Sequence, residues 1–140
     1  MRHAEGVLDT NIVAVLALHN ADELPEAVLI TAVTLGELSD APHATDDPIR
    51  RARRMAVLQH VEATFDALPY DDEAARMYGQ ICAAVRAGGR QPRGRVADLM
   101  IAAIAASNGL PLYTANPKDF AGLEDMVEIV AVPRPPDATA

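Results

Sequence analysis

Four acidic residues stand where the end of a predicted strand or helix directs a carboxylate toward one side of a sheet: Asp9, Glu37, Asp98 and Asp119. Each has a simple structural alternative, because an acid also favours a helix N-terminus, caps a turn or lies on a solvated helix face. Both interpretations stay open for any single acid. A group of four carboxylates, however, repels itself unless a cation lies among them.

Two of these acids lie in apolar surroundings. Asp98 precedes an almost uninterrupted apolar helix, and Glu37 lies between Leu35 and Leu38, so both are expected to be at least half-buried. Buried carboxylates are costly unless they are paired or bind a cation. Oxygen ligands select Mg²⁺ or Mn²⁺ over zinc, and no metal-spaced cysteine or histidine pattern competes. The acids therefore predict a Mg²⁺ or Mn²⁺ site.

The first acid, Asp9, directly follows a short apolar run. Val7 and Leu8 form a short apolar run that ends at Asp9, and a helical pattern then extends to Leu18 with Thr10 or Asn11 as its cap. In open α/β sheets, ligands collect at the carboxyl ends of the strands. Asp9 is thus predicted to lie at the edge of such a sheet where the carboxyl ends of the strands meet.

Short apolar runs alternate with helical patterns along the rest of the chain. Strands are predicted at 28–31, 67–70, 112–114 and 127–132, and helices at 32–39, 48–65, 71–87 and 96–107. Alternating strands and helices indicate an α/β fold with a mostly parallel sheet covered on both faces. We expect one domain over residues 1–132 and a proline-rich, disordered tail over 133–140.

The composition describes an acidic chain with two basic islands. The formal charge is −8, yet four arginines lie within 50–54 and four more within 86–95. Phosphate contacts are made chiefly by Lys and Arg, so these islands are either solvated surface or nucleic-acid contacts. No apolar run approaches a membrane span or a signal peptide, and the lone Cys82 agrees with a reducing compartment, so a cytoplasmic protein without membrane contact is expected.

Four motifs in series resemble those of PIN-domain proteins, and most closely those of VapC-type ribonuclease toxins of bacterial toxin–antitoxin pairs. They are an Asp-Thr-Asn after the first strand, Thr-Leu-Gly-Glu-Leu at 34–38, Ala-Asp-Leu-Met-Ile-Ala-Ala at 97–103 and Thr-Ala-Asn-Pro-Lys-Asp-Phe at 114–120. The likeness extends over roughly 7–132. It implies a PIN-like three-layer α/β/α sandwich and a Mg²⁺- or Mn²⁺-dependent endoribonuclease.

The resemblance also assigns residues. Asp9, Glu37 and Asp98 match the three firmest acids of the family as catalytic metal ligands, and either Asp119 or Asn116 completes the set. Thr10 and Asn116 would orient a carboxylate or a water. The metal would promote phosphodiester hydrolysis that leaves a 5′-phosphate and a 3′-hydroxyl.

The resemblance implies partners as well as a substrate. A cognate VapB-type antitoxin would cover the acidic site, and a homodimer is expected. Apolar positions that suit either an antitoxin groove, a dimer surface or the core are Val15, Leu18, Leu58 and Val61. The loop before the third motif supplies candidate contacts to the RNA backbone at Arg90, Arg93 and Arg95. The arginines of 50–54 are interpreted as solvated or partner-facing.

Two other classes of protein share parts of this pattern. One is a catalytically inactive PIN-fold binding module whose acids serve only as caps. The other is a metal-dependent phosphatase with an aspartyl nucleophile, but Asn11 stands where its second Asp would be. The intact set of acids favours the nuclease over the binding module.

Overall fold

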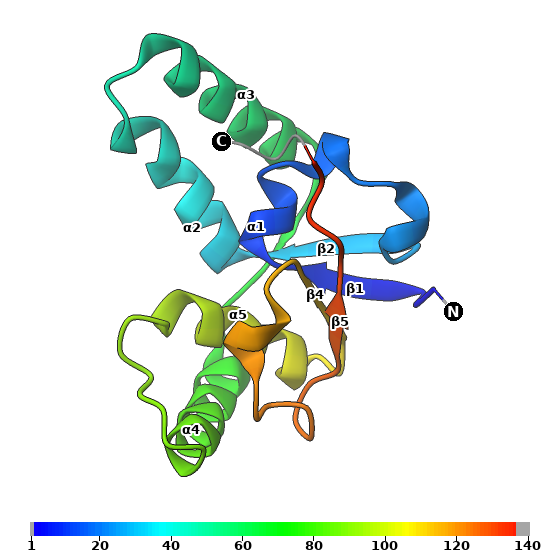
Figure 1. The fold of residues 1–140 in the computed structure, drawn as a ribbon, viewed down its shortest axis with the longest axis vertical. Coiled ribbons are helices and arrows are strands. Elements are labelled where there is room, and N and C mark those ends of the chain that lie inside the picture. The colour runs from blue at the N-terminus through cyan, green and yellow to red at the C-terminus, as the bar shows by residue number, and fades with distance from the viewer. Residues whose placement is uncertain (1, 137–140) are drawn as a thin grey trace.

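The computed structural model describes residues 2–136 and is built around a five-stranded parallel sheet (Figure 1). Its strands are β1 (Glu5–Leu8), β2 (Ala27–Thr31), β3 (Ala67–Leu68), β4 (Leu112–Thr114) and β5 (Ile129–Ala131). Their order across the sheet is β3-β2-β1-β4-β5. Since all neighbours are parallel, every strand ends at the same edge.

Within residues 2–136, five α-helices and four short 3₁₀ turns accompany the strands. The helices are α1 (Thr10–Val13), α2 (Ala32–Asp40), α3 (Pro48–Thr64), α4 (Asp72–Ala87) and α5 (Val96–Ser107). The 3₁₀ turns are η1 (Leu16–Leu18), η2 (Ala21–Glu23), η3 (Ala41–Ala44) and η4 (Pro117–Phe120). Crossover helices of this kind are what parallel strands require.

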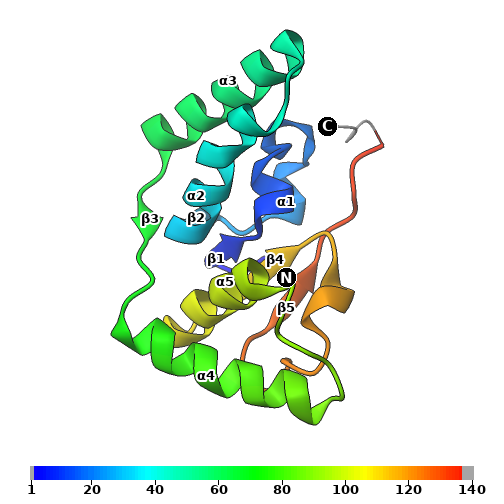
Figure 2. The same cartoon turned by 90° about the vertical axis from the view of Figure 1, so that its left-hand side faces the viewer.

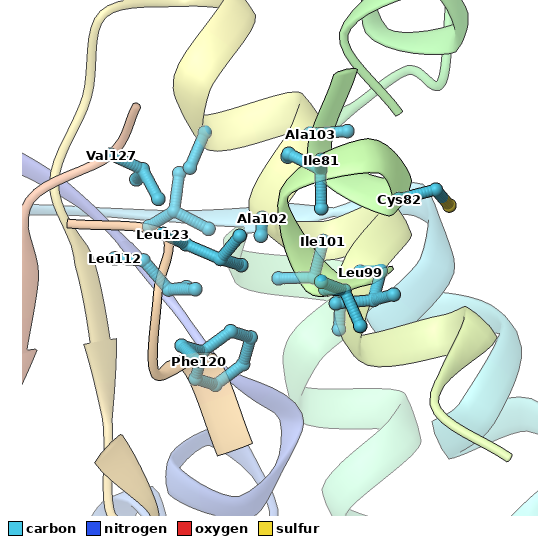
Figure 3. Close-up of a cluster of buried hydrophobic side chains, with 13 residues drawn as sticks. Ile81, Cys82, Leu99, Ile101, Ala102, Ala103, Leu112, Phe120, Leu123 and Val127 are labelled. Carbon is cyan, nitrogen blue, oxygen red and sulfur yellow. The ribbon is translucent and has the colours of Figure 1, made fainter. Parts of the chain in front are cut away.

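The helices cover both faces of the sheet because neighbouring strand residues point to opposite sides. Val7 belongs to a core formed with α4, α5 and η4, whereas Leu8 belongs to a second core formed with α1, α2 and α3. Figure 2 shows the two groups of helices on either side of the strands. Figure 3 shows the first core, in which Phe120 and Leu123 pack against α4 and α5.

Side-chain caps fix where the helices begin. The Asp47 carboxylate accepts from the backbone N–H of Ile49 at α3, and the Asp71 carboxylate accepts from that of Ala74 at α4. Such caps satisfy donors that have no partner within the helix. Both starts agree with the boundaries predicted from the sequence.

The predicted fold class is confirmed, with differences at the helix after Asp9, at β3, which spans Ala67–Leu68 rather than 67–70, and at the last strand. The pattern after Asp9 is not one helix to Leu18, because α1 ends at Val13 and the chain leaves helical geometry at Val15 (φ −129°, ψ 34°) before η1. β-branched residues at 12, 13 and 15 disfavour a longer helix. The cap is Asp9 rather than Thr10 or Asn11.

The C-terminal part of the chain also differs from prediction. The last strand is shorter than 127–132, and 133–136 continue beyond it without regular secondary structure. The predicted disorder of 137–140 lies outside the described residues. Within 2–136, no helix combines the length and the apolar character needed to cross a bilayer.

Candidate active site

The predicted acidic residues lie at the edge where the parallel strands end. Asp9 directly follows β1, and Glu37 lies on α2, which begins where β2 ends. Asp98 lies in the first turn of α5, and Asp119 lies in η4 after β4. Figure 1 shows the starts of α1 and α2 beside the ends of β1 and β2.

Asp9 is the most deeply buried of the four acids. Its side chain is 4% exposed. One carboxylate oxygen accepts from the backbone N–H of Thr10 at 2.9 Å, and the other accepts from the hydroxyl of Thr114 at 2.8 Å. The carboxylate is therefore both the cap of α1 and an acid fixed in one orientation.

A series of hydroxyl groups connects α1 to α2. Thr10 donates to the Glu37 carboxylate at 2.6 Å, and the Thr10 oxygen lies 2.8 Å from the hydroxyl of Thr34. The Thr34 backbone N–H in turn donates to the side chain of Thr31, the cap of α2. Thr10, predicted to orient a carboxylate, thus contacts Glu37.

Glu37 differs from its predicted environment. It was expected to be half-buried, but its side chain is exposed while the neighbouring Leu38 is buried. One residue corresponds to about 100° around a helix, so an acid beside a core leucine can still face solvent.

Thr114 was not identified from the sequence. It is fully buried at the end of β4, donates to Asp9 and accepts from the backbone N–H of Asn116 at 3.0 Å. A signal was available, because Thr114, like Thr31, is a hydroxyl residue that ends an apolar strand at the same edge as Asp9.

Arg95 contacts Asp119 and lies close in the chain to Asp98. The Arg95 guanidinium donates to the backbone carbonyl of Asp119 at 2.8 Å and lies 3.8 Å from its carboxylate. Arg95 is also the residue that precedes α5, three positions before Asp98. Arg95 therefore ties η4 to the start of α5.

The other residues predicted around the site have different surroundings. Arg90 donates to the backbone carbonyl of Lys118 at 3.1 Å, while Arg93 is exposed without a side-chain hydrogen bond among residues 2–136. The side chain of Asn116 accepts from Arg134 at 3.3 Å. The contact of Asn116 with the site is made by its backbone N–H, which donates to the hydroxyl of Thr114.

Burial and like charges perturb two of the acids. Burial raises the pKa of Asp9 to about 6; the Thr114 hydrogen bond opposes this shift, and the charge of Asp98 adds to it. Burial also raises the pKa of Asp98, and the charges of Asp119 and Glu37 raise it further. The charge of Asp98 therefore interacts unfavourably with those of the other three acids.

This donor set fits a divalent cation. Among residues 2–136, no Lys, Arg or His forms an ion pair with Asp9, Glu37 or Asp98, and only the charge of Arg95 partly opposes the raised pKa of Asp98. Within that range, no group of three or more Asp, Glu, His or Cys side chains lies in an arrangement that could hold a metal ion, so the fit rests on the chemistry of the donors. Oxygen donors that leave room for water suit Mg²⁺, which keeps several waters in most protein sites.

The arginines of 50–54 and the apolar candidates for a partner surface lie in different environments. In the first basic island, Arg51 and Arg54 donate to backbone carbonyls of the turn before α3, so only Arg50 and Arg53 are solvated without such contacts in the described chain.

Among the apolar candidates for a partner surface, Val61 is buried in the core and Leu18 is 47% exposed.

Comparison with known proteins gives concordant results. The model of the PIN domain family matches residues 7–125. The chain is 42% identical to Ribonuclease VapC5 of Mycobacterium tuberculosis over 134 residues, which cover 92% of this chain and 96% of that protein. It is 38% identical to the tRNA(fMet)-specific endonuclease VapC of Shigella flexneri over 91 residues, 65% of each chain.

The fold comparison agrees with the sequence comparison. The crystal structure of VapBC-5 from Mycobacterium tuberculosis, described as a member of the VapBC family of toxin–antitoxin systems, contains a chain that is 41% identical to this one. The two chains superpose with a TM-score of 0.81, over 92% of this chain and 99% of that one.

Proposed function

Since the chain belongs to the PIN-domain family of VapC-type ribonucleases, we propose that it is a metal-dependent endoribonuclease, the toxin of a toxin–antitoxin pair. The observation that carries this proposal is the buried carboxylate of Asp9, which lies among like charges at the open edge of the sheet without a counterion in the described chain. Such an arrangement is costly for stability, and a bound cation would offset that cost.

The roles proposed for the acids follow from their surroundings. Asp9 and Asp98, the two with raised pKa values, would hold Mg²⁺ or Mn²⁺, and Glu37 and Asp119 would contribute directly or through water. When bound, the cation supplies charge neutralisation at the phosphate and makes water more acidic. Thr114 and Thr10 keep the carboxylates of Asp9 and Glu37 oriented.

The RNA backbone must approach a site that is itself negatively charged. Arg93 is the proposed contact in the loop before α5, because its exposed guanidinium remains available whereas Arg90 and Arg95 already donate to carbonyls of η4. Arg95 stays a candidate through its unused N–H groups, which can still reach a phosphate at the start of α5.

A cognate VapB-type antitoxin and a homodimer complete the proposal. The solved relative comes from a toxin–antitoxin system, which supports an antitoxin for this chain. Two apolar side chains are suited to such contacts because they are exposed to solvent. Leu18 in η1 is 47% exposed, and Ile49 in the first turn of α3 is 64% exposed.

Cleavage of RNA by the purified chain tests the function. Total cellular RNA, with its tRNA fraction also assayed separately, is incubated with the wild type and with the Asp9→Asn and Asp98→Asn variants in Mg²⁺ or Mn²⁺. We expect discrete cuts by the wild type, none in EDTA, and a loss of at least 100-fold in both variants. Asp46→Asn makes the same chemical change at an exposed acid outside the site and should cut as the wild type does.

Circular dichroism of each variant separates loss of chemistry from loss of fold. If the metal-loaded wild type cuts nothing, or if the two site variants cut as well as the wild type, the nuclease proposal fails. An inactive PIN-fold binding module would then be the better account.

A further inference from the structure

Arg134 lies beyond the last strand and beside the acidic edge. The β4–β5 ladder pairs Thr114 with Ala131, and the backbone N–H of Val132 donates to the carbonyl of Thr114 at 2.9 Å. The ladder therefore fixes the direction in which the chain leaves β5. Arg134 follows two residues later, at the edge where β1 and β4 also end.

The guanidinium of Arg134 is directed toward the site by a side-chain contact. Its Nη2 donates to Oδ1 of Asn116 at 3.3 Å, and the Asn116 backbone N–H donates to the Thr114 hydroxyl that in turn donates to Asp9. Three consecutive hydrogen bonds thus connect Arg134 to the buried carboxylate. The Asn116 contact uses one of five guanidinium N–H groups, so the others are available to a ligand.

The position of Arg134 relative to the acids follows from the sheet. Glu37, Asp9 and Asn116 follow β2, β1 and β4, which are successive neighbours, and Arg134 follows β5 at the next place along the edge. Strands lie about 4.8 Å apart, so β5 is roughly 10 Å from the strand that carries Asp9. A cation at that distance can contact a nucleotide beside the one being cut.

The charge of Arg134 is not neutralised by an acid within residues 2–136, where the two ion pairs join His3 to Glu128 and Arg95 to Asp119. Arg134 is exposed. An exposed, oriented guanidinium beside a row of carboxylates is suited to hold a phosphate that those carboxylates repel.

We propose that Arg134 binds the phosphate of a nucleotide flanking the scissile bond and that Asn116 orients it for this contact. This inference rests on the proposed function. Arg134 is a positioning residue for the substrate, because it holds the strand in register while the acids and their cation act on the neighbouring phosphate.

The test uses a labelled single-stranded RNA fragment that spans a cut site mapped with the wild type. Binding is measured with Mg²⁺ over a series of salt concentrations, in an Asp98→Asn background that prevents cutting. Arg134→Gln should weaken binding about tenfold and reduce the slope of log K against log salt by about 0.7, the value for one phosphate contact on a single strand. Arg134→Lys should retain the slope.

Two controls separate this role from a general effect of charge. Arg53→Gln removes the same charge from the exposed face of α3, where Arg53 makes no side-chain hydrogen bond in the described chain, and should leave affinity and slope unchanged. Asn116→Ala should weaken binding less than Arg134→Gln does and keep the salt slope. The melting temperature of Arg134→Gln should equal that of its background.

Each result bears on one of the two proposals. If Arg134→Gln and Arg53→Gln bind RNA equally well, the inference about Arg134 is wrong. The proposed nuclease function is still supported in that case if the wild type cuts RNA. Faster cutting by Arg134→Gln overturns it as well, because Arg134 would then obstruct the site. A wild type that neither cuts nor binds RNA removes both proposals.

Discussion

Replacing Asp9 with Asn should stabilise the protein when no divalent metal is present. Asn has the same shape as Asp but carries no charge, so it relieves both the burial of the carboxylate and its repulsion from Asp98 and Glu37. The amide oxygen can still accept from the backbone N–H of Thr10, and the amide NH₂ can donate to the oxygen of Thr114.

The raised pKa sets the size and the pH range of this effect. A shift from 3.8 to about 6 corresponds to about 3 kcal/mol of differential stability, at 1.36 kcal/mol for each pH unit. Because the folded-state pKa lies above the unfolded value, the contribution of this group to stability is fully present below pH 3.8 and is lost as the pH rises through about 6. The reversed hydrogen bond at Thr114 offsets about 1 kcal/mol of the gain.

The assay is thermal or urea unfolding in EDTA from pH 4 to pH 8. Asp9→Asn should match the wild type or fall below it near pH 4 and exceed it by about 2 kcal/mol at pH 8, roughly 6 °C in melting temperature. The control Asp46→Asn alters an exposed carboxylate and should stay within about 0.5 kcal/mol of the wild type. Added Mn²⁺ should stabilise the wild type and not Asp9→Asn. A variant that is less stable at pH 8, or a difference that does not change with pH, refutes the reasoning.

Three further predictions concern contacts of Thr114, of Gly6 on β1 and of Gly79 on α4. Thr114→Val keeps the shape but removes the hydroxyl that orients Asp9, so Mn²⁺ affinity measured by titration calorimetry should fall at least about tenfold, while Thr114→Ser retains it; equal affinities would contradict this role. Gly6→Ala places a Cβ 2.6 Å from the buried ring of Tyr113 and should lower the free energy of unfolding by about 1–3 kcal/mol. Gly79→Ala, which meets nothing within 4 Å, should raise it by about 0.5–1 kcal/mol, and a destabilised Gly79→Ala would show that the packing around α4 is misjudged.

The sequence predicted those features of the site that depend on local patterns. The apolar run before Asp9 and the helix after Asp98 each have a clear period or composition, and parallel strands bring their ends to one edge. The order of elements and the location of the acids followed from these patterns. The resemblance to a family added the chemistry.

Contacts between distant segments could not be predicted in the same way. The hydrogen bond from Thr114 to Asp9 spans 105 residues, and the contacts of Arg90 and Arg95 to η4 span 28 and 24. No local period specifies such pairs. The exposure of Glu37 depends on how α2 is rotated against α3, which the two leucines beside Glu37 do not determine.

The chemistry of the cut ends tests the central claim most directly. A single RNA that the wild type cuts in Mg²⁺ is digested, and both new ends are identified by susceptibility to a 5′-phosphate-dependent exonuclease and by mass. Hydrolysis promoted by a cation held among Asp9, Glu37, Asp98 and Asp119 predicts a 5′-phosphate and a 3′-hydroxyl, with no product in EDTA. A 2′,3′-cyclic phosphate, or cutting that persists in EDTA, would contradict the account, because the 2′-hydroxyl would then be the nucleophile and the acids would not be a metal site.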